Sequence, residues 1–323
     1  AYSNYIIKYN LEIDEKSCCI NFITEEHDIN LIEYHKFIKY IIIWLKIAND
    51  YSTSNCGKKL NIYIYLTNFK KLIPKSQFQI LDCNNVNSGL SNGCETTSEI
   101  IIYRREEWFK VLIHEIFHNY GLVFSILNLN IYNKKLENIF PIPKNILLFE
   151  SYCEIWANFI NSAFVSYSFL DKKNDFNSFK KYMEVCLNFE LKFTLIQMSK
   201  ILLFMNLNYN DLYSKNPKSI EKRNIFYKEK TNVCAYFIIK TILFYNLEDF
   251  LIWCSENNVN ILRFKKSEKS VSSLIDFIEE RYKKKKFINL LSYFKNKLSE
   301  YGNNNKNHDF FQNLRLTLLE LNI

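Results

Sequence analysis

The sequence predicts an α+β fold, in which a small mixed sheet and a buried helix (residues 1–125) precede a mostly helical second part (residues 126–323). Three observations support this division. Short stretches rich in Ile and Tyr lie before residue 104, whereas apolar residues follow helical spacing after residue 143. The 323 residues contain five Gly and four Pro, and so few helix breakers favour long helices. With 48 % hydrophobic residues, the chain can bury the core of one large or two medium domains.

The first part should contain four strands, one long helix and a loop. Ile and Tyr recur in four short stretches that we expect to be strands: residues 5–9, 17–23, 60–66 and 99–103. Residues 30–50 should form a helix, because apolar side chains recur there every three to four positions. Residues 84–93 should form a loop, since Asn, Ser and two of the five glycines gather in this stretch.

A second helix should follow the fourth strand directly. Glu106 and Glu107 stand where acidic side chains favour the positive end of a helix. From Trp108 to His118 the sequence is largely apolar, which predicts a buried helix. Gly121 then accepts the left-handed conformation with which helices commonly end.

The second part should be helical throughout. The spacing of apolar residues predicts seven helices, over residues 145–164, 176–205, 231–245, 247–256, 271–286, 287–301 and 309–321. We expect a functional site in the cleft between the two parts.

The most informative stretch is His-Glu-Ile-Phe-His, residues 114–118. Residues i and i+4 share one face of a helix, so His114 and His118 can both direct imidazole nitrogens at one metal ion. Glu115 lies about 100° around the helix and can reach a water beside that ion. The alternative is a pair of core histidines whose nitrogens bind backbone carbonyls.

A pair of acidic residues lies on the first helix of the second part. Glu150 and Glu154 are also four residues apart, and their helix is apolar nearly all round. Buried carboxylates need a partner, and a metal ligand with a supporting carboxylate would explain both. The alternative is a buried salt bridge to Lys or Arg. Cys153, one turn from Glu150, could contact the site but is interpreted as a buried structural thiol.

These two motifs together resemble the gluzincin branch of the zincin metallopeptidases. The resemblance covers residues 98–160 and implies a zincin-like fold that binds Zn²⁺ and hydrolyses a peptide or protein substrate. Carried over by position, it makes His114, His118 and Glu150 the zinc ligands and Glu115 the general base. Glu154 becomes the acid that orients a ligating histidine. This sequence has Glu where the family has Asp, so the order of Glu150 and Glu154 stays open.

The resemblance also implies how a substrate would bind. The strand at residues 99–103 would pair with an extended peptide, and a downstream Tyr or His would stabilise the oxyanion. The 22 tyrosines leave that residue unassigned. Residues 87–93 either line the same cleft or form an ordinary surface turn.

Two other functions remain open. The chain is also similar to uncharacterised proteins of large DNA viruses, and a zincin scaffold without catalysis could serve as a structural component of a virion. The net charge of +8 and the lysines at residues 283–286 suggest nucleic-acid binding. No aromatic recognition motif accompanies these lysines, so we interpret them as a solvated face and do not predict a nucleic-acid partner.

Composition also bears on the compartment. Nine cysteines, an odd number without a CxxC pair, predict free thiols in the cytoplasm or another reducing compartment. The longest apolar stretches are too short or too interrupted to cross a bilayer, so no transmembrane segment is expected.

Overall fold

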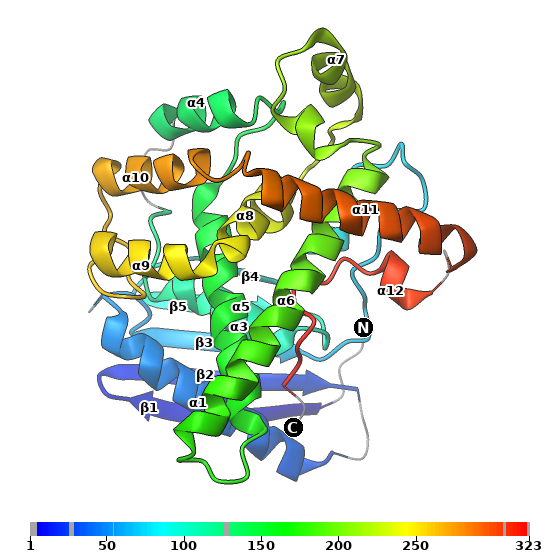
Figure 1. The fold of residues 1–323 in the computed structure, drawn as a ribbon. Coiled ribbons are helices and arrows are strands. Elements are labelled where there is room, and N and C mark those ends of the chain that lie inside the picture. Colours follow the sequence, from blue (N-terminus) through cyan, green and yellow to red (C-terminus); the bar gives the residue numbers. More distant parts are fainter. Residues whose placement is uncertain (1–4, 26–28, 54, 126–129, 306–307, 322–323) are drawn as a thin grey trace.

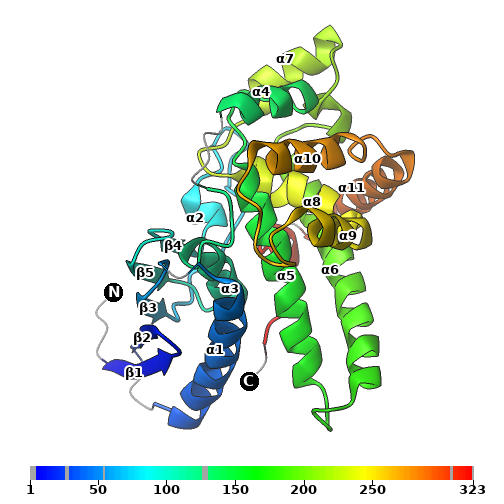
Figure 2. The ribbon, with the colours of Figure 1, turned by 90° about the vertical axis from the view of Figure 1, so that its left-hand side faces the viewer.

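The computed structural model describes residues 5–25, 29–53, 55–125, 130–305 and 308–321. It is an α+β protein with a small sheet on one side and a larger group of helices on the other, as Figures 1 and 2 show. No helix within the described ranges is long and apolar enough to cross a membrane.

The sheet has five strands in the order β1-β2-β3-β5-β4. β1 (Tyr5–Ile13) and β2 (Lys16–Thr24) form an antiparallel hairpin, and β3 (Lys59–Tyr65) and β5 (Thr97–Ile102) continue the sheet in parallel. The four strands predicted from the Ile- and Tyr-rich stretches are therefore confirmed. The fifth, β4 (Gly89–Ser91), pairs antiparallel with β5.

The prediction of a loop over residues 84–93 was wrong. The helix α2 (Cys83–Val86) and strand β4 occupy most of it. Asn, Ser and Gly are typical of turns, but Asp82 caps α2 by accepting a hydrogen bond from the backbone N–H of Asn84. β4 has only three residues, too few for an alternating pattern to be recognised in the sequence.

Two helices cover one face of the sheet. α1 (Leu31–Tyr51) and α3 (Trp108–Asn119) lie on the same side in Figure 2 and contact each other. Alternate residues of the central strands are fully buried, as the period of two requires, and Ile100 and Ile102 are examples. Gly121 ends α3 with a φ of +65° and packs against Cys56, where a Cβ would lie 2.8 Å from Sγ.

The remaining chain is mostly helical. Its helices are α4 (Asn130–Ile139), α5 (Leu148–Ser168), α6 (Phe176–Phe204), α7 (Pro217–Phe226), α8 (Lys240–Tyr245), α9 (Leu247–Asn257), α10 (Glu268–Glu279), α11 (Lys285–Asn305) and α12 (Asp309–Gln312), with a 3₁₀ turn at Tyr209–Leu212 and a π-helix at Cys234–Ile239. Six of the seven predicted helices are present, although the one expected over residues 231–245 begins as the π-helix. α4 and α7 were not predicted.

The helix predicted over residues 309–321 was wrong beyond Gln312. The C-terminal segment, residues 313–321, runs without helical structure between the sheet side and α5 and α6. Two buried carboxylates accept its backbone N–H groups, which therefore need no helical partners. Oε1 of Glu107 accepts from Leu316 and Thr317, at 2.5 and 2.6 Å. Oε1 of Glu190 accepts from Leu318 and Leu319, both at 2.8 Å.

Glu107 also departs from its expected role at the start of α3. It stands at the N-cap but makes no capping hydrogen bond with its side chain. The carboxylate instead forms a buried ion pair with Lys71, at 2.7 Å. Glu107 therefore joins the first turn of α3 to both Lys71 and the C-terminal segment.

The expectation that all nine cysteines are free thiols was wrong for two of them. Cys56 and Cys94 form a disulfide across 38 residues. The register of the parallel strands explains this pairing: Lys59 lies opposite Thr97, and each cysteine stands three residues before its strand. The other seven cysteines are free: Cys18, Cys19, Cys83, Cys153, Cys186, Cys234 and Cys254.

Candidate metal centre

The centre forms where α3 packs against α5. α3 carries His114 and His118 one turn apart on the face toward α5, and Glu150 projects from the first turn of α5. The Nε2 atoms of the two histidines are 3.2 Å apart. Oε2 of Glu150 lies 3.1 Å from Nε2 of His114 and 3.7 Å from Nε2 of His118. The two motifs singled out in the sequence therefore meet at one point.

These spacings suit a tetrahedral metal ion. An ion that binds nitrogen and oxygen ligands at about 2.0–2.1 Å keeps each pair of ligand atoms about 3.3–3.4 Å apart. The three observed separations, 3.1, 3.2 and 3.7 Å, bracket that value. Two imidazoles and one carboxylate are also a common donor set for zinc, and they leave a fourth position open.

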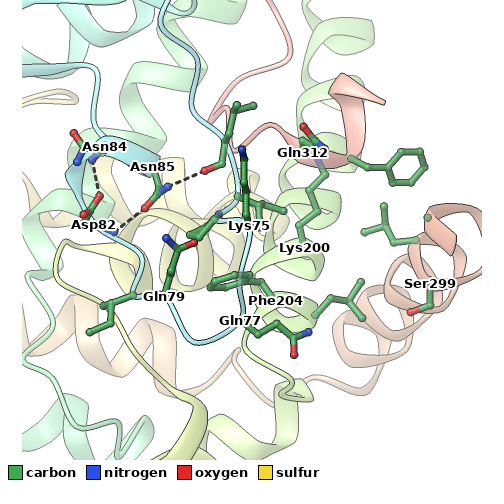
Figure 3. Close-up of a pocket in the computed structure, with 18 residues that line it drawn as sticks. Lys75, Gln77, Gln79, Asp82, Asn84, Asn85, Lys200, Phe204, Ser299 and Gln312 are labelled. Carbon is green, nitrogen blue, oxygen red and sulfur yellow. Dashed lines mark hydrogen bonds between the residues drawn. The ribbon is translucent and has the colours of Figure 1, made fainter. Parts of the chain in front are cut away.

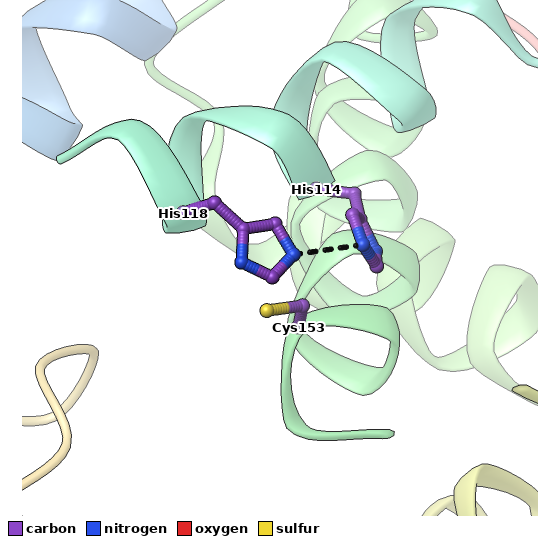
Figure 4. A group of neighbouring side chains, drawn as sticks. All are labelled: His114, His118 and Cys153. Atoms are coloured by element: carbon purple, nitrogen blue, oxygen red, sulfur yellow. Dashed lines mark hydrogen bonds between the residues drawn. The ribbon is translucent and has the colours of Figure 1, made fainter. Parts of the chain in front are cut away.

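Cys153 offers another possible ligand. Its Sγ and the ligand atoms of His114 and His118 all lie within 4.8 Å of one another, and Figure 4 shows the sulfur beneath the two rings. A zinc–sulfur bond of about 2.3 Å would place the sulfur about 3.5 Å from each nitrogen. Oε2 of Glu150 lies 3.1 and 3.7 Å from the two nitrogens, close to the spacing around a tetrahedral zinc ion, so we prefer it as the third ligand. The sequence left open a contact between Cys153 and the site but favoured a structural thiol, and the sulfur lies close to both histidines.

Glu154 lies on the other side of the His114 ring. Its Oε2 accepts a hydrogen bond from Nδ1 of His114 at 2.8 Å, and its Oε1 pairs with Lys110 in a buried salt bridge. In the neutral ring, a proton held on Nδ1 leaves the lone pair on Nε2, which faces Glu150 and His118. The salt bridge that the sequence left as an alternative is therefore present, together with the contact to histidine.

The negative charges of Glu150 and Glu154 stabilise a positive charge in the centre. Burial opposes a charged imidazole, but hydrogen bonds to Glu150 and Glu154 and their negative charges raise the pKa of His114 to about 10. Burial acts to raise the pKa of Glu150, but the charge of His118 and hydrogen bonds to both histidines hold it below its usual value. A proton or a metal cation can supply that positive charge.

Glu115 faces strand β4. Oγ of Ser91 donates a hydrogen bond to Oε2 of Glu115 at 2.7 Å. Gly89 leaves room for this approach, because a Cβ there would lie 2.8 Å from Cγ1 of Val111 and 3.3 Å from Oε1 of Glu115. Residues 87–93 therefore do more than form a surface turn, since their strand contacts the helix that carries both histidines.

A small cavity adjoins Glu115 and His114. Its volume is about 30 Å³, enough for about one water molecule, and Ser88 and Tyr236 also line it. The buried hydroxyl of Ser88 has no hydrogen-bond partner among the described residues, which favours a water there.

The sequence did not single out Tyr236. This residue comes from the π-helix, and its hydroxyl donates a hydrogen bond to Oε2 of Glu150 at 3.0 Å. The apolar spacing of residues 231–245 predicted an ordinary helix, and nothing distinguished Tyr236 from the other tyrosines. Single π-helical turns occur frequently at functional sites, but the widened turn left no pattern in the sequence.

β5, the strand that was expected to pair with a substrate, is not at the edge of the described sheet. β5 pairs with β3 on one side and with β4 on the other, where Gly89 lies opposite Ile102 and Ser91 opposite Ile100. β4 is instead the outer strand of the described sheet on this side.

The remaining sequence features lie outside the centre. The lysines at residues 283–286 are exposed, as expected of a solvated face.

Comparison of the chain with models of protein families, with curated proteins and with solved structures found no match. The geometry around His114, His118 and Glu150 is therefore the main indication of function in the described residues.

Proposed function

We propose that the chain is a zinc-dependent peptidase of the zincin type that hydrolyses a peptide or protein substrate. His114, His118 and Glu150 would hold the ion, and Glu115 would act as general base. The spacing of the three ligand atoms carries the proposal, because 3.1, 3.2 and 3.7 Å correspond to one face of a tetrahedron around zinc.

Each residue then has a defined role in hydrolysis. Zinc, when bound, supplies a Lewis acid that lowers the pKa of water to about 7. Glu115 accepts a proton from the attacking water and later donates it to the leaving amine. Ser91 fixes one oxygen of Glu115 through its hydrogen bond and leaves the other for the water. Glu154 holds the ring of His114 through Nδ1.

Strand β4 is the element that would align the substrate. It is the outer strand on this side of the described sheet, and an extended peptide can add to such an edge through backbone hydrogen bonds. Ser91 lies on β4 and contacts Glu115, so the strand that aligns the peptide would also orient the general base.

The ligand set makes a prediction about metal content. Purified protein should contain about one equivalent of zinc by mass spectrometry of the metal. His118→Ala and Glu150→Ala should lose most of it, because three protein ligands are needed to hold zinc at a catalytic site. Cys153→Ser should retain it and serves as the matched control on the same helix as Glu150. Zinc lost from Cys153→Ser but kept by Glu150→Ala would make the cysteine the third ligand. A wild-type protein that neither contains nor takes up zinc would refute the proposal.

Tyr236 is proposed to stabilise the oxyanion. Tyr236→Phe should lower kcat by about 10²-fold with little change in KM, because the hydroxyl would act mainly in the transition state. Steady-state kinetics on a cleaved peptide would measure both constants. Tyr152→Phe is the control, since Tyr152 is also buried and donates a hydrogen bond, to the carbonyl of Leu262 at 3.1 Å. Equal losses in the two variants would show that Tyr236 is only structural.

One observation favours a second candidate function, a scaffold that binds zinc without catalysis. The cavity beside Glu115 has a volume of only about 30 Å³, which admits water but no peptide side chain. Bound zinc without cleavage of any member of a broad peptide library would support this scaffold. Cleavage by the wild type would exclude it and would require the site to open for substrate.

A further inference from the structure

A large cavity lies away from the metal centre. Its volume is about 880 Å³, and it opens between residues 72–85 and the helices α6, α11 and α12 (Figure 3). It shares no lining residue with the small cavity beside Glu115. The peptidase proposal therefore assigns it no role.

Its size and walls suit a small amphiphilic molecule. Ligand sites are commonly about 300–1,000 Å³ in volume and mostly apolar, with a few polar groups. Apolar side chains here come from all the surrounding elements, among them Ile73, Leu203, Phe204, Leu298 and Phe311. The polar groups are chiefly the amides Gln77, Gln79, Asn84, Asn85 and Gln312.

Lys200 is the unusual member of the lining. It is 3 % exposed, and its Nζ donates hydrogen bonds to the backbone carbonyls of Phe310 and Asn313. Among the described residues no carboxylate forms an ion pair with it. The only acid in the lining, Asp82, accepts a hydrogen bond from the backbone of Asn84. Burial lowers the pKa of Lys200 to about 7, because its partners are neutral.

We propose that this cavity binds an organic carboxylate with an apolar body, of the class of fatty acids. The ligand carboxylate would be the negatively charged partner that Lys200 lacks among the described residues. A buried cation gains most from a directly paired anion. Lys75, which also lines the cavity and is exposed, adds positive charge toward solvent. The apolar walls would take the chain of the ligand. The proposal does not depend on zinc or on peptide cleavage.

Calorimetric titration with decanoate tests whether the ligand carboxylate pairs with Lys200. The wild-type protein should bind decanoate saturably and bind decan-1-ol at least about ten-fold more weakly, because the alcohol cannot pair with Lys200. Lys200→Met should raise the Kd for decanoate by about ten-fold or more, whereas Lys200→Arg should keep most of the affinity. Lys295→Met is the matched control. Lys295 also donates to a backbone carbonyl, that of Leu207 at 2.8 Å, but it does not line the cavity.

A second variant tests the cavity without removing a hydrogen bond. Gly302 lies on α11 in the lining, and a Cβ there would meet Phe311 at an ordinary distance of 3.7 Å. Gly302→Trp should therefore fill the space and abolish decanoate binding, while an unchanged melting temperature shows that the fold is retained. No saturable binding to the wild type would overturn the proposal. So would equal affinity for the alcohol, binding unchanged in both Lys200→Met and Gly302→Trp, or displacement of decanoate by polyglutamate, which would assign the cavity to an acidic peptide.

Discussion

Replacing Glu115 by Gln is expected to lower kcat for peptide hydrolysis by about 10²–10⁴-fold while about one zinc remains bound. Glutamine has nearly the same shape and can still accept the hydrogen bond from Ser91, but it cannot take a proton from water. The ligand atoms of His114, His118 and Glu150 stay in place. The measurement is steady-state hydrolysis of a peptide found by library screening, with zinc content determined on the same sample.

Glu99→Gln is the control for this substitution. Glu99 is an exposed acid on β5, so its replacement removes the same charge from a neighbouring element without touching the centre. It should leave kcat unchanged. Full activity in Glu115→Gln with zinc retained would rule out Glu115 as the general base, and loss of zinc would show that its role is to hold the site together.

The second large effect should appear in stability. Glu107→Ala is expected to lower the free energy of unfolding by about 3–5 kcal/mol, because it leaves Lys71 buried without its partner. The backbone N–H groups of Leu316 and Thr317 would lose their acceptor as well. Urea denaturation followed by circular dichroism measures the change. If the C-terminal segment detaches, a protease should also cleave near residue 314 more rapidly.

Asp309→Ala provides a comparison at the start of the same region. Asp309 pairs with Lys70 at 2.6 Å, but both side chains are largely exposed, so solvent screens this pair. Its loss should not measurably shift the denaturation midpoint. A similar small effect for Glu107→Ala would mean that the buried ion pair and the segment it holds contribute little to stability.

Much of the centre was predictable because its chemistry repeats at helical spacing. His114 and His118 stand four residues apart, as do Glu150 and Glu154, and acids in an apolar helix need partners. The sequence alone therefore places both helices at one site. Four strands could also be predicted, because repeated Ile and Tyr residues are typical of strands.

The parts that could not be predicted depend on contacts distant in sequence. Glu107 and Glu190 hold residues 313–321 in place, yet a run with regular leucines is indistinguishable from a helix when its partners are unknown. Tyr236 contacts Glu150, 86 residues earlier in the chain, from a π-helical turn that the apolar spacing does not reveal. The Cys56–Cys94 disulfide follows from the strand register, which composition cannot reveal.

The C-terminal segment also sets an order of events during protein synthesis. Asn158 donates a hydrogen bond to the carbonyl of Leu316, and Asn161 to that of Leu319, so the helix that carries Glu150 is anchored to residues made much later. At about 5–20 residues per second, the ribosome needs about 10–30 s to proceed from Glu154 to Leu319. During that time the nascent chain already contains His114 and His118, but the helix that carries Glu150 is not yet anchored. The proposed hydrolytic activity would then arise only after residue 319 has been synthesised.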